Sequence, residues 1–364
     1  TMEKYDVIAF YLPQFHPIEE NEKWWGKGFT EWTNVGNAKP LFPGHYQPRV
    51  PKDLGYYDLR LEEVAEQQSE LALENGVTGF MYWHYWFGNG KTIMDMPIKR
   101  MLNDKKIKIK FSVCWANHSW YAKNWNSRDS KTDKLLIEQQ YLGKQDYIDY
   151  FNYCLPLFKD ERYLLIDNKP LFGLYQPYSM PDINEFIDLW NEMAKANGFD
   201  GIYFMAFNSR CNGYEKFKNS AYDACVVDCV ADSKYYGKSR FLNKCYYWLC
   251  RKLGFPEIVP YDNYVKTCFK YFMEHEDVVP CIVPNYDHTP RSKRAGMLLH
   301  KSTPEKWETL LKGIKRILDS KETKNSSSRL LFIKAWNEWA EGNYLEPDCV
   351  FGRSYLERIK KIFG

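Results

Sequence analysis

The 364-residue sequence lacks the long apolar segments and the charge imbalance that would place it across a membrane or on nucleic acid. No run of 18 apolar residues occurs, so no segment is predicted to span a bilayer. Its 50 basic and 47 acidic residues leave a net charge of +3, which predicts no nucleic-acid partner. No apolar signal segment follows Met2, and we therefore expect a cytoplasmic protein.

Several motifs of cofactor and metal chemistry are also missing. The sequence has no G-x-G-x-x-G, H-E-x-x-H, G-x-S-x-G or D-x-D. The stretch GNGKT at 88–92 resembles the end of a phosphate-binding loop, but Tyr85 stands where that loop requires glycine. The seven histidines show no metal-ligand spacing. We expect neither a metal nor a cofactor.

The ten cysteines show no C-x-x-C spacing. Several of them, including Cys114, Cys225 and Cys281, lie in apolar runs, where a free cysteine behaves as a small hydrophobic residue. Reduced thiols are therefore expected, and a disulfide framework is the alternative.

Eight apolar runs of strand length are present, separated by segments of helical periodicity. The runs cover 7–13, 77–87, 109–117, 170–176, 202–208, 222–228, 280–287 and 330–338. Strands that are apolar on both faces and alternate with helices indicate a parallel sheet covered by helices. We predict a single (β/α)8 TIM barrel over 1–364, with long loops after strands 1 (14–58) and 6 (229–279). An open doubly wound sheet is the alternative, but its glycine-rich first turn is replaced here by YLPQFHP.

Aromatic residues are abundant, with 28 Tyr, 22 Phe and 13 Trp, and many stand at strand ends or in the first long loop. Aromatic rings among polar groups suit the faces of sugars. Because barrel enzymes build their sites at the carboxyl ends of the strands, we expect one open cleft there. The residues predicted to line it are Trp32, Tyr46, His84, Trp86, Trp115, Asn117, Trp120, Tyr175 and Asn337.

The stretch AWNEWAEGNYLEP at 335–347 contains the candidate catalytic pair, Glu338 and Glu341. Residues three apart share a face only on a helical turn, so the chain must curl after Glu338, which Gly342 permits. Two carboxyls about 5–5.5 Å apart are typical of retaining glycoside hydrolysis. Lys334, which has the same strand parity as Glu338, is placed to keep it ionised, with Glu341 protonated. The alternatives are that Glu341 only solvates a loop and that Lys334 points outward.

Five stretches carry a resemblance to a known family: AFYLPQFHPIEENEKWWGKGFTEWTNV, GHYQPRVPKDLGYYDLR, GFMYWHYWF, CWANHSW and FIKAWNEWAEGNYLEPD. The chain resembles glycoside hydrolase family 99-like proteins, in particular the WbsX-like branch found among O-antigen and capsular polysaccharide genes. The resemblance spans residues 8 to 348 and implies a (β/α)8 barrel acting on glycosidic bonds.

The founding family cleaves α-mannosides with retention, through an epoxide-like intermediate formed by the sugar's own 2-hydroxyl. The resemblance implies that Glu338 deprotonates this hydroxyl and that Glu341 is the acid/base at the glycosidic oxygen. Ala340 stands where the founding family typically has histidine, so the sugar contacts differ. The expected function is a retaining glycoside hydrolase acting on a bacterial surface polysaccharide, such as lipopolysaccharide O-antigen, or on its precursor. A glycosyltransferase or transglycosylase of polysaccharide biosynthesis and a non-catalytic carbohydrate-binding barrel are the alternatives.

Residues 234–252 form a basic and aromatic segment in the second long loop. It contains Lys234, Lys238, Arg240, Lys244, Arg251 and Lys252 among Tyr and Trp residues. Such a segment suits weak peripheral contact with a membrane. The alternative is a helical insertion that packs on the barrel with its charges in water.

Overall fold

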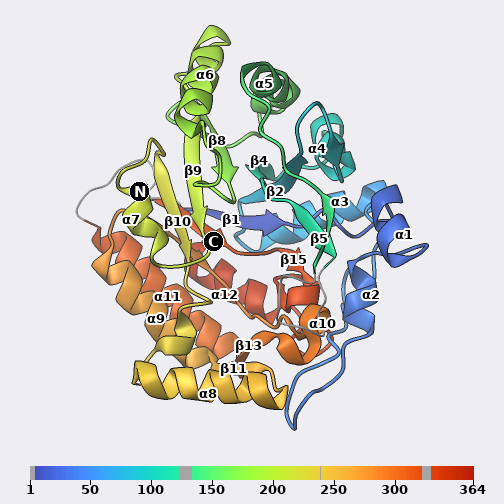
Figure 1. Ribbon diagram of the computed structural model, residues 1–364, viewed down its shortest axis with the longest axis vertical. Helices are drawn as coiled ribbons and strands as arrows, with labels where there is room; N and C mark the ends of the chain where they lie inside the picture. The colour runs from blue at the N-terminus through green and yellow to red at the C-terminus, as the bar shows by residue number, and fades with distance from the viewer. Residues whose placement is uncertain (1–4, 123–132, 238, 322–328) are drawn as a thin grey trace.

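Eight parallel strands close into a barrel in the computed structural model, which describes residues 5–122, 133–237, 239–321 and 329–364 (Figure 1). In spatial order the strands are β1 (Asp6–Tyr11), β14 (Leu330–Ile333), β12 (Val278–Ile282), β10 (Ala224–Asp228), β9 (Tyr203–Asn208), β8 (Lys169–Leu174), β4 (Lys110–Trp115) and β2 (Gly79–Trp86). β1 pairs with both β14 and β2, which closes the ring. The predicted (β/α)8 fold is confirmed, and each predicted apolar run overlaps one barrel strand.

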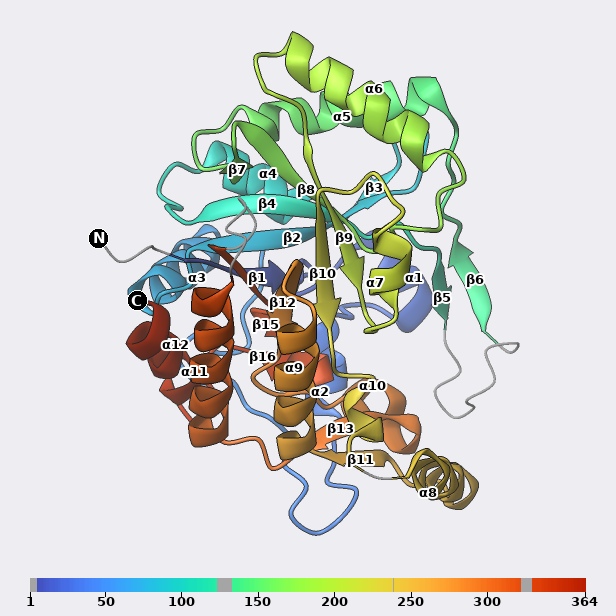
Figure 2. The ribbon, with the colours of Figure 1, turned by 90° about the vertical axis from the view of Figure 1, so that its left-hand side faces the viewer.

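Helices cover the outside of the barrel. The longer ones are α3 (Glu62–Glu74), α4 (Met96–Asn103), α5 (Lys144–Phe158), α6 (Ile183–Ala196), α9 (Tyr261–Glu274), α11 (Pro304–Ser320) and α12 (Ser354–Phe363). α9, α11 and α12 lie in a row along one side (Figure 2). α11 shows why such segments are helical: Thr303 caps its start, Pro304 fixes the first turn, and its buried residues recur at helical spacing.

Two apolar layers form the core, and β2 contributes to both. Met81 points into the barrel, where it belongs to a cluster with Phe10, Met205 and Phe332. Phe80 and Tyr82, the alternate residues of β2, belong instead to the larger cluster between strands and helices. This alternation decides which residues of each strand can reach the interior of the barrel.

Additional short elements follow the strands at their carboxyl ends. The first long loop holds α1 (Glu19–Trp25) and α2 (Glu31–Gly36), and a hairpin of β5 (Trp120–Ala122) and β6 (Lys134–Ile137) follows β4. After β10 come η2 (Ser233–Tyr235), α8 (Arg240–Leu253) and β11 (Glu257–Pro260). After β12 come α10 (Thr289–Ser292), η3 (Lys293–Ala295) and β13 (Met297–His300), which pairs with β11. The remaining short elements are β3 (Thr92–Ile93), β7 (Leu165–Ile166) and α7 (Gly213–Phe217).

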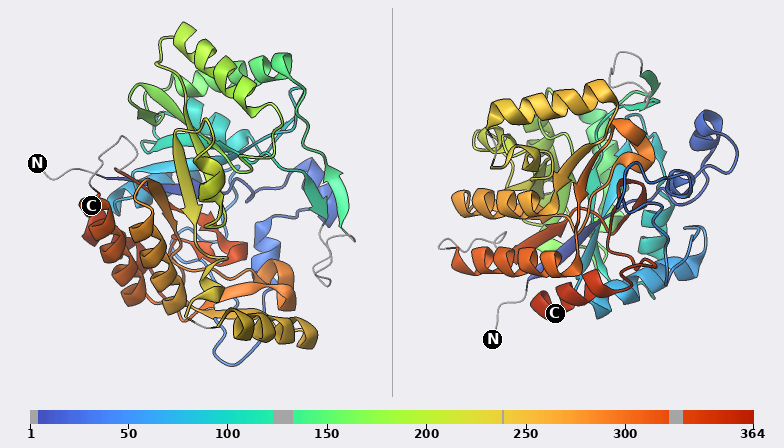
Figure 3. Two further views of the ribbon diagram at one scale, coloured as in Figure 1. Left: turned by 60° about the vertical axis from the view of Figure 1, so that its left-hand side comes forward. Right: turned by 90° about the horizontal axis from the view of Figure 1, so that it is seen from below.

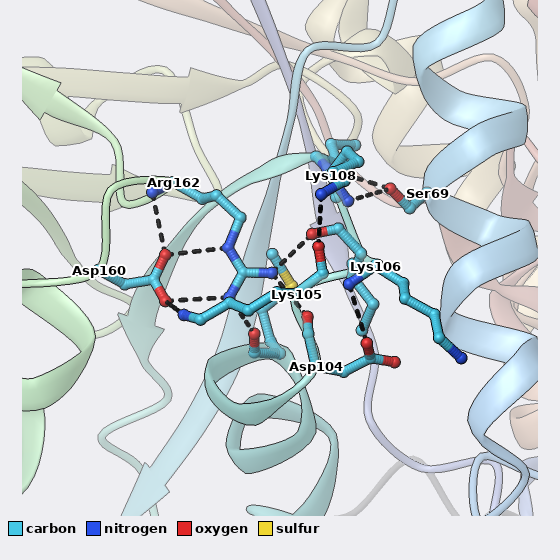
Figure 4. Close-up of polar contacts among 10 residues, drawn as sticks. Ser69, Asp104, Lys105, Lys106, Lys108, Asp160 and Arg162 are labelled. Atoms are coloured by element: carbon cyan, nitrogen blue, oxygen red, sulfur yellow. Dashed lines mark hydrogen bonds and ion pairs between the residues drawn. The ribbon is translucent and has the colours of Figure 1, made fainter.

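The opposite end of the barrel is held by a buried arginine. Arg162 bonds both oxygens of Asp160 and donates to the backbone carbonyls of Met101, Asp104 and Ile107 (Figure 4). These carbonyls lie at the end of α4 and in the turn before β4, so one guanidinium fixes two connections. Charge-assisted bonds of this kind are stronger than neutral ones, which gives the barrel a rigid base away from its carboxyl-end loops.

Among the described residues, no helix is long and apolar enough to cross a membrane. All ten cysteines are free.

Candidate active site

A tight turn after β14 carries both predicted glutamates. Glu338 ends β15 (Asn337–Glu338), which pairs antiparallel with β16 (Asn343–Tyr344), and Glu341 lies in the 3-10 turn η5 (Trp339–Glu341) between them. Gly342 closes the turn with φ of 56°, and a Cβ there would lie 2.8 Å from Cβ of Asp287. The chain therefore curls where the sequence predicts, and glycine is required for both its conformation and the close approach.

One arginine, Arg291 of α10, joins the two glutamates. Its Nη1 lies 2.6 Å from Oε1 of Glu341 and 3.1 Å from Oε1 of Glu338. Because both oxygens bond to one nitrogen, they lie within about 6 Å of each other, a limit compatible with the spacing used in retaining glycoside hydrolysis. Arg291 also bonds Oε2 of the buried Glu31, at the start of α2, through Nε at 3.2 Å and Nη2 at 3.1 Å. Three carboxylates thus surround one guanidinium.

Residues of the first long loop hold Arg291 in place through Asp287. The buried carboxylate of Asp287 accepts hydrogen bonds from the backbone N–H of Thr289 at 2.9 Å and from Nε2 of Gln47 at 2.8 Å. Its Oδ2 also lies 2.7 Å from Nε2 of His45. Asp287 therefore fixes the start of α10 at Thr289. Arg291, two residues further along this helix, bonds the two glutamates.

The two glutamates have opposite pKa shifts. Burial and the charge of Glu341 raise the pKa of Glu338 to about 7. Burial would also raise the pKa of Glu341, but the charge of Arg291 and the contact with His288, 3.5 Å away, bring it well below its ordinary value. These directions favour the proton on Glu338 rather than on Glu341, the reverse of the order predicted from the sequence. The cause is Arg291, which bonds Glu341 more closely than Glu338 and which the sequence did not place.

Lys334 points into the barrel mouth and pairs with Asp228. Its Nζ lies 2.5 Å from Oδ2 of Asp228 and 5.0 Å from the centre of the Tyr286 ring. It therefore neither snorkels outward nor bonds Glu338, although its charge lowers the pKa of Glu338 after the larger effects of burial, Glu341 and Arg291. The direct partner of this lysine is therefore Asp228 rather than Glu338.

A cavity of about 620 Å³ opens beside the two glutamates at the carboxyl ends of the strands. Of the nine predicted binding residues, Trp120 and Tyr175 line it. The polar and aromatic lining residues that the sequence did not single out as binding residues include Gln14, Glu31, Trp83, Tyr85, His118, Phe207, Arg210, Tyr286, His288 and Arg291. The volume falls within the range of small-molecule sites.

The other seven predicted binding residues are not among the residues that line this cavity. Three of them are buried between the strands and α5: His84 contacts the Tyr150 hydroxyl at 2.8 Å, Trp86 stacks on the Tyr150 ring, and Trp115 donates to the carbonyl of Trp86. Strand alternation explains this result, because the odd-numbered neighbours on β2, Trp83 and Tyr85, face the cavity instead.

The remaining four stabilise the loops around the site. Asn117 bonds the backbone of Gln176, and Trp32 donates its indole N–H to the carbonyl of Tyr57 at 2.8 Å. The guanidinium of Arg49 lies over the ring of Tyr46, with Cζ 4.9 Å from the ring centre. Asn337 is buried and bonds both backbone groups of Leu12 at the end of β1, at 2.7 and 3.0 Å. These residues position the loops that carry the site.

A buried acidic residue, Glu346, supports the turn that carries Glu338 and Glu341. It accepts hydrogen bonds from the indole of Trp339 at 2.7 Å, the amide of Gln68 at 2.7 Å and the hydroxyl of Tyr57 at 3.0 Å. Burial raises its pKa to about 7 despite these donors. Trp339 directly follows Glu338 in the chain. Its hydrogen bond to Glu346 therefore fixes the backbone of the turn that carries Glu338 and Glu341.

Within the described part of the chain, no group of three or more His, Cys, Asp or Glu residues is arranged to hold a metal ion.

Residues 7–359 match the family model described as glycosyltransferase WbsX. WxcX of Xanthomonas campestris pv. campestris, from strains ATCC 33913 and B100, is 31% identical over 360 residues, which is 98% of this chain and 49% of WxcX. The chain thus spans about half the length of these curated relatives.

Two solved structures share the fold over 99% of this chain. A glycoside hydrolase-like protein has a TM-score of 0.62 at 13% identity, with 94% of its own chain covered. The family 99 endo-α-mannosidase from Bacteroides thetaiotaomicron has a TM-score of 0.58 at 14% identity, with 97% covered. At such identities the similarity concerns the fold, whereas the family match covers almost the whole sequence. The chain therefore belongs to the family described as glycosyltransferase WbsX.

Proposed function

We propose that the protein is a carbohydrate-active enzyme that cleaves a glycosidic bond in a bacterial surface polysaccharide or its precursor, with Glu338 and Glu341 as its catalytic residues. The observation that carries this proposal is the pair of carboxylates bound to one nitrogen of Arg291 at the edge of the cavity. Half-buried Trp83, Trp120 and Tyr175 supply apolar faces suited to sugar rings. The family match supports a role with polysaccharide.

The pKa shifts favour a specific division of labour. Glu338, with its raised pKa, carries the proton that the departing glycosidic oxygen needs. Glu341 stays anionic beside Arg291 and acts on the sugar, by taking the proton of the 2-hydroxyl or by attacking the anomeric carbon. Water then adds to the anomeric carbon and gives its proton to Glu338, while the bond from that carbon to O2 of the sugar, or to Glu341, breaks. Where Glu341 took the 2-hydroxyl proton, it returns this proton to O2, and both glutamates regain their starting states. This order reverses the roles that the family 99 resemblance implies.

A second candidate is transfer of the sugar to another saccharide by the same pair. It is favoured by the description of the matched family as a glycosyltransferase family. In that case the acceptor hydroxyl takes the place of water, and its proton passes to Glu338. Transfer and hydrolysis share the first bond cleavage and differ in what reaches the anomeric carbon.

The test is a screen of surface polysaccharides and their oligosaccharides, with and without nucleotide sugars, followed by mass and anomeric analysis of the products. We expect glycosidic cleavage or exchange that both Glu338→Gln and Glu341→Gln reduce by about 10²-fold or more. Glu192→Gln, at an exposed position on α6, is the matched control and should retain full activity. If both catalytic-site variants stay within a few-fold of the wild type on a substrate that it turns over, the assignment is refuted.

Substrates with activated aryl leaving groups separate the two roles. A good leaving group needs little protonation, so it should restore the bond-cleaving step in the variant that lacks the acid. We expect this restoration in Glu338→Gln and not in Glu341→Gln. The opposite pattern would contradict the proposed roles and leave the cleavage reaction itself intact.

A further inference from the structure

Helix α8 lies at the edge of the molecule, away from the barrel strands (Figures 2 and 3). It contacts the protein through a narrow face whose buried members are Asn243, Tyr247 and Cys250. The hydroxyl of Tyr247 donates to the carbonyl of Lys234, and Gly254 ends the helix in a left-handed conformation. The helix is therefore attached to the rest of the protein along this buried face.

The outward face of α8 is apolar, the reverse of an ordinary surface helix. Phe241 is 72% exposed, Trp248 60%, Leu242 60% and Leu253 61%. With Leu249, these side chains recur at helical spacing, and they form one continuous surface on the side away from the barrel. A soluble surface helix normally turns such residues inward, so exposed apolar residues in this number indicate a surface that binds something.

Basic residues lie beside this apolar stripe, Lys252 lies within it, and α8 contains no Asp or Glu. Lys244 and Arg251 lie along one side of the helix, and Nζ of Lys252 lies 5.1 Å from the centre of the Trp248 ring. Glu257 pairs with Arg251 at 3.2 Å and with the half-buried Lys234 at 3.3 Å. Of the basic residues predicted for this surface, Lys238 and the side chain of Arg240 lie outside the described part of the chain.

The charge continues beyond the helix into a neighbouring groove of about 1050 Å³. Its basic lining residues are Lys39, Arg251, Arg291, Lys293 and Arg294, and its described lining contains no acidic residue. Arg251 of α8 is paired with Glu257, and Arg291 is surrounded by Glu31, Glu338 and Glu341, so the groove extends from the helix to the glutamate cluster. The positive charge that the groove adds to that of α8 comes from Lys39, Lys293 and Arg294, and it favours anionic partners.

We propose that α8 docks on an anionic membrane surface, with its apolar stripe among the acyl chains and its basic flank on the lipid headgroups. An interfacial helix requires an apolar face, basic residues beside it and little acidic charge, and α8 has all three. The opposite charges of the basic flank and an acidic lipid surface identify the partner. This docking does not depend on the catalytic proposal.

Vesicle flotation tests the proposal, using phosphatidylcholine alone and phosphatidylcholine mixed with phosphatidylglycerol. The wild type should bind the mixed vesicles and release in high salt. Trp248→Glu should lower binding by about tenfold or more, since a large apolar side chain no longer inserts. Lys252→Gln should lower it about fivefold, the equivalent of roughly 1 kcal/mol for one basic residue at an acidic surface.

Two variants serve as matched controls. Met273→Glu changes an apolar residue of α9 that is 67% exposed, and Lys195→Gln changes an exposed lysine on α6, at the opposite end of the molecule (Figure 1). Both should bind vesicles as the wild type does. Since all four substitutions are at partly or fully exposed positions, circular dichroism and thermal melting should match the wild type.

Three outcomes would overturn the proposal. The wild type fails to float with acidic vesicles, or it binds both lipid mixtures equally, or the four variants lose binding alike. Sedimentation velocity distinguishes a second copy as the occupant: a dimer that Trp248→Glu dissociates, without vesicle binding, would show that α8 joins two protein chains instead.

Discussion

Removing the guanidinium of Arg291 tests the electrostatic organisation of the active site. The substitution Arg291→Met keeps much of the side-chain volume but leaves Glu31, Glu338 and Glu341 around an uncharged group. Their side chains are 8%, 12% and 16% exposed, so water screens them weakly. Breaking a buried ion pair by removing one partner typically costs about 3–5 kcal/mol. We expect a loss of this size in the free energy of unfolding near neutral pH.

The loss should depend on pH with a definite sign. In the wild type the pKa of Glu341 is lowered, so its contribution is present above the ordinary carboxyl pKa and is lost as the pH falls through the lowered value. In Arg291→Met the same carboxyl, without its cation, should have a raised pKa, and stability is then lost as the pH rises. The difference between the two proteins should therefore already be present in mild acid above the ordinary carboxyl pKa, grow further toward neutral pH, and shrink as the pH falls below that ordinary value.

Urea unfolding of both proteins in mild acid and in mild base measures this difference. Arg353→Met is the matched control, because Arg353 is 48% exposed and pairs with Asp53 at the surface, where a pair contributes about 0–1 kcal/mol. Adding Glu31→Gln to Arg291→Met should recover part of the loss, since one uncompensated charge disappears. A loss below about 1 kcal/mol at neutral pH, or one independent of pH, would refute the reasoning.

Three further predictions concern the turn, the lysine and the buried glutamate. Gly342→Ala should destabilise the protein by about 1–2 kcal/mol from its left-handed φ alone, with the approach to Asp287 adding to it, and an unchanged melting temperature would contradict this. Lys334→Met leaves Asp228 buried without its cation, and we expect a loss of about 3–5 kcal/mol in urea unfolding, together with a pKa of Glu338 above 7 in the pH–rate profile. Glu346 stays protonated in the folded protein up to about pH 7, whereas it ionises near 4.5 when unfolded, so its stabilisation is full below pH 4.5 and is lost as the pH rises to 7. Glu346→Gln should flatten that part of the stability–pH curve, and an unchanged curve would show that other groups cause it.

The barrel could be predicted from the sequence because its strands are apolar on both faces. A strand buried between a barrel interior and a helix layer gives an uninterrupted apolar run, and eight such runs with helices between them admit few folds. The catalytic turn was equally accessible. Glu338, Glu341 and Gly342 are neighbours in the chain, and local geometry governs how neighbouring residues are arranged.

The same double burial explains why the aromatic residues were misplaced. When both faces of a strand are apolar, the sequence does not show which alternate residues face the interior, and a shift of one residue exchanges the two sets. His84 and Trp86 were chosen on β2, but Trp83 and Tyr85 line the cavity. Glu31 lies in the first long loop and Arg291 follows the seventh apolar run, and no spacing rule relates them. Their contact arises only from the closed barrel, and with it the pKa order of the glutamates.

The contact between Arg291 and Glu31 joins residues 260 positions apart. The contacts of Arg291 with Glu338 and Glu341, in the turn after the last barrel strand, join residues 47 and 50 positions apart. Loop closure over such distances is slow, and a chain emerging from the ribosome cannot complete the cluster until its final segment is available. The active site is consequently a product of the last stage of folding. Recovery of activity during refolding should follow ring closure between β1 and β14, and lag behind the appearance of helical structure.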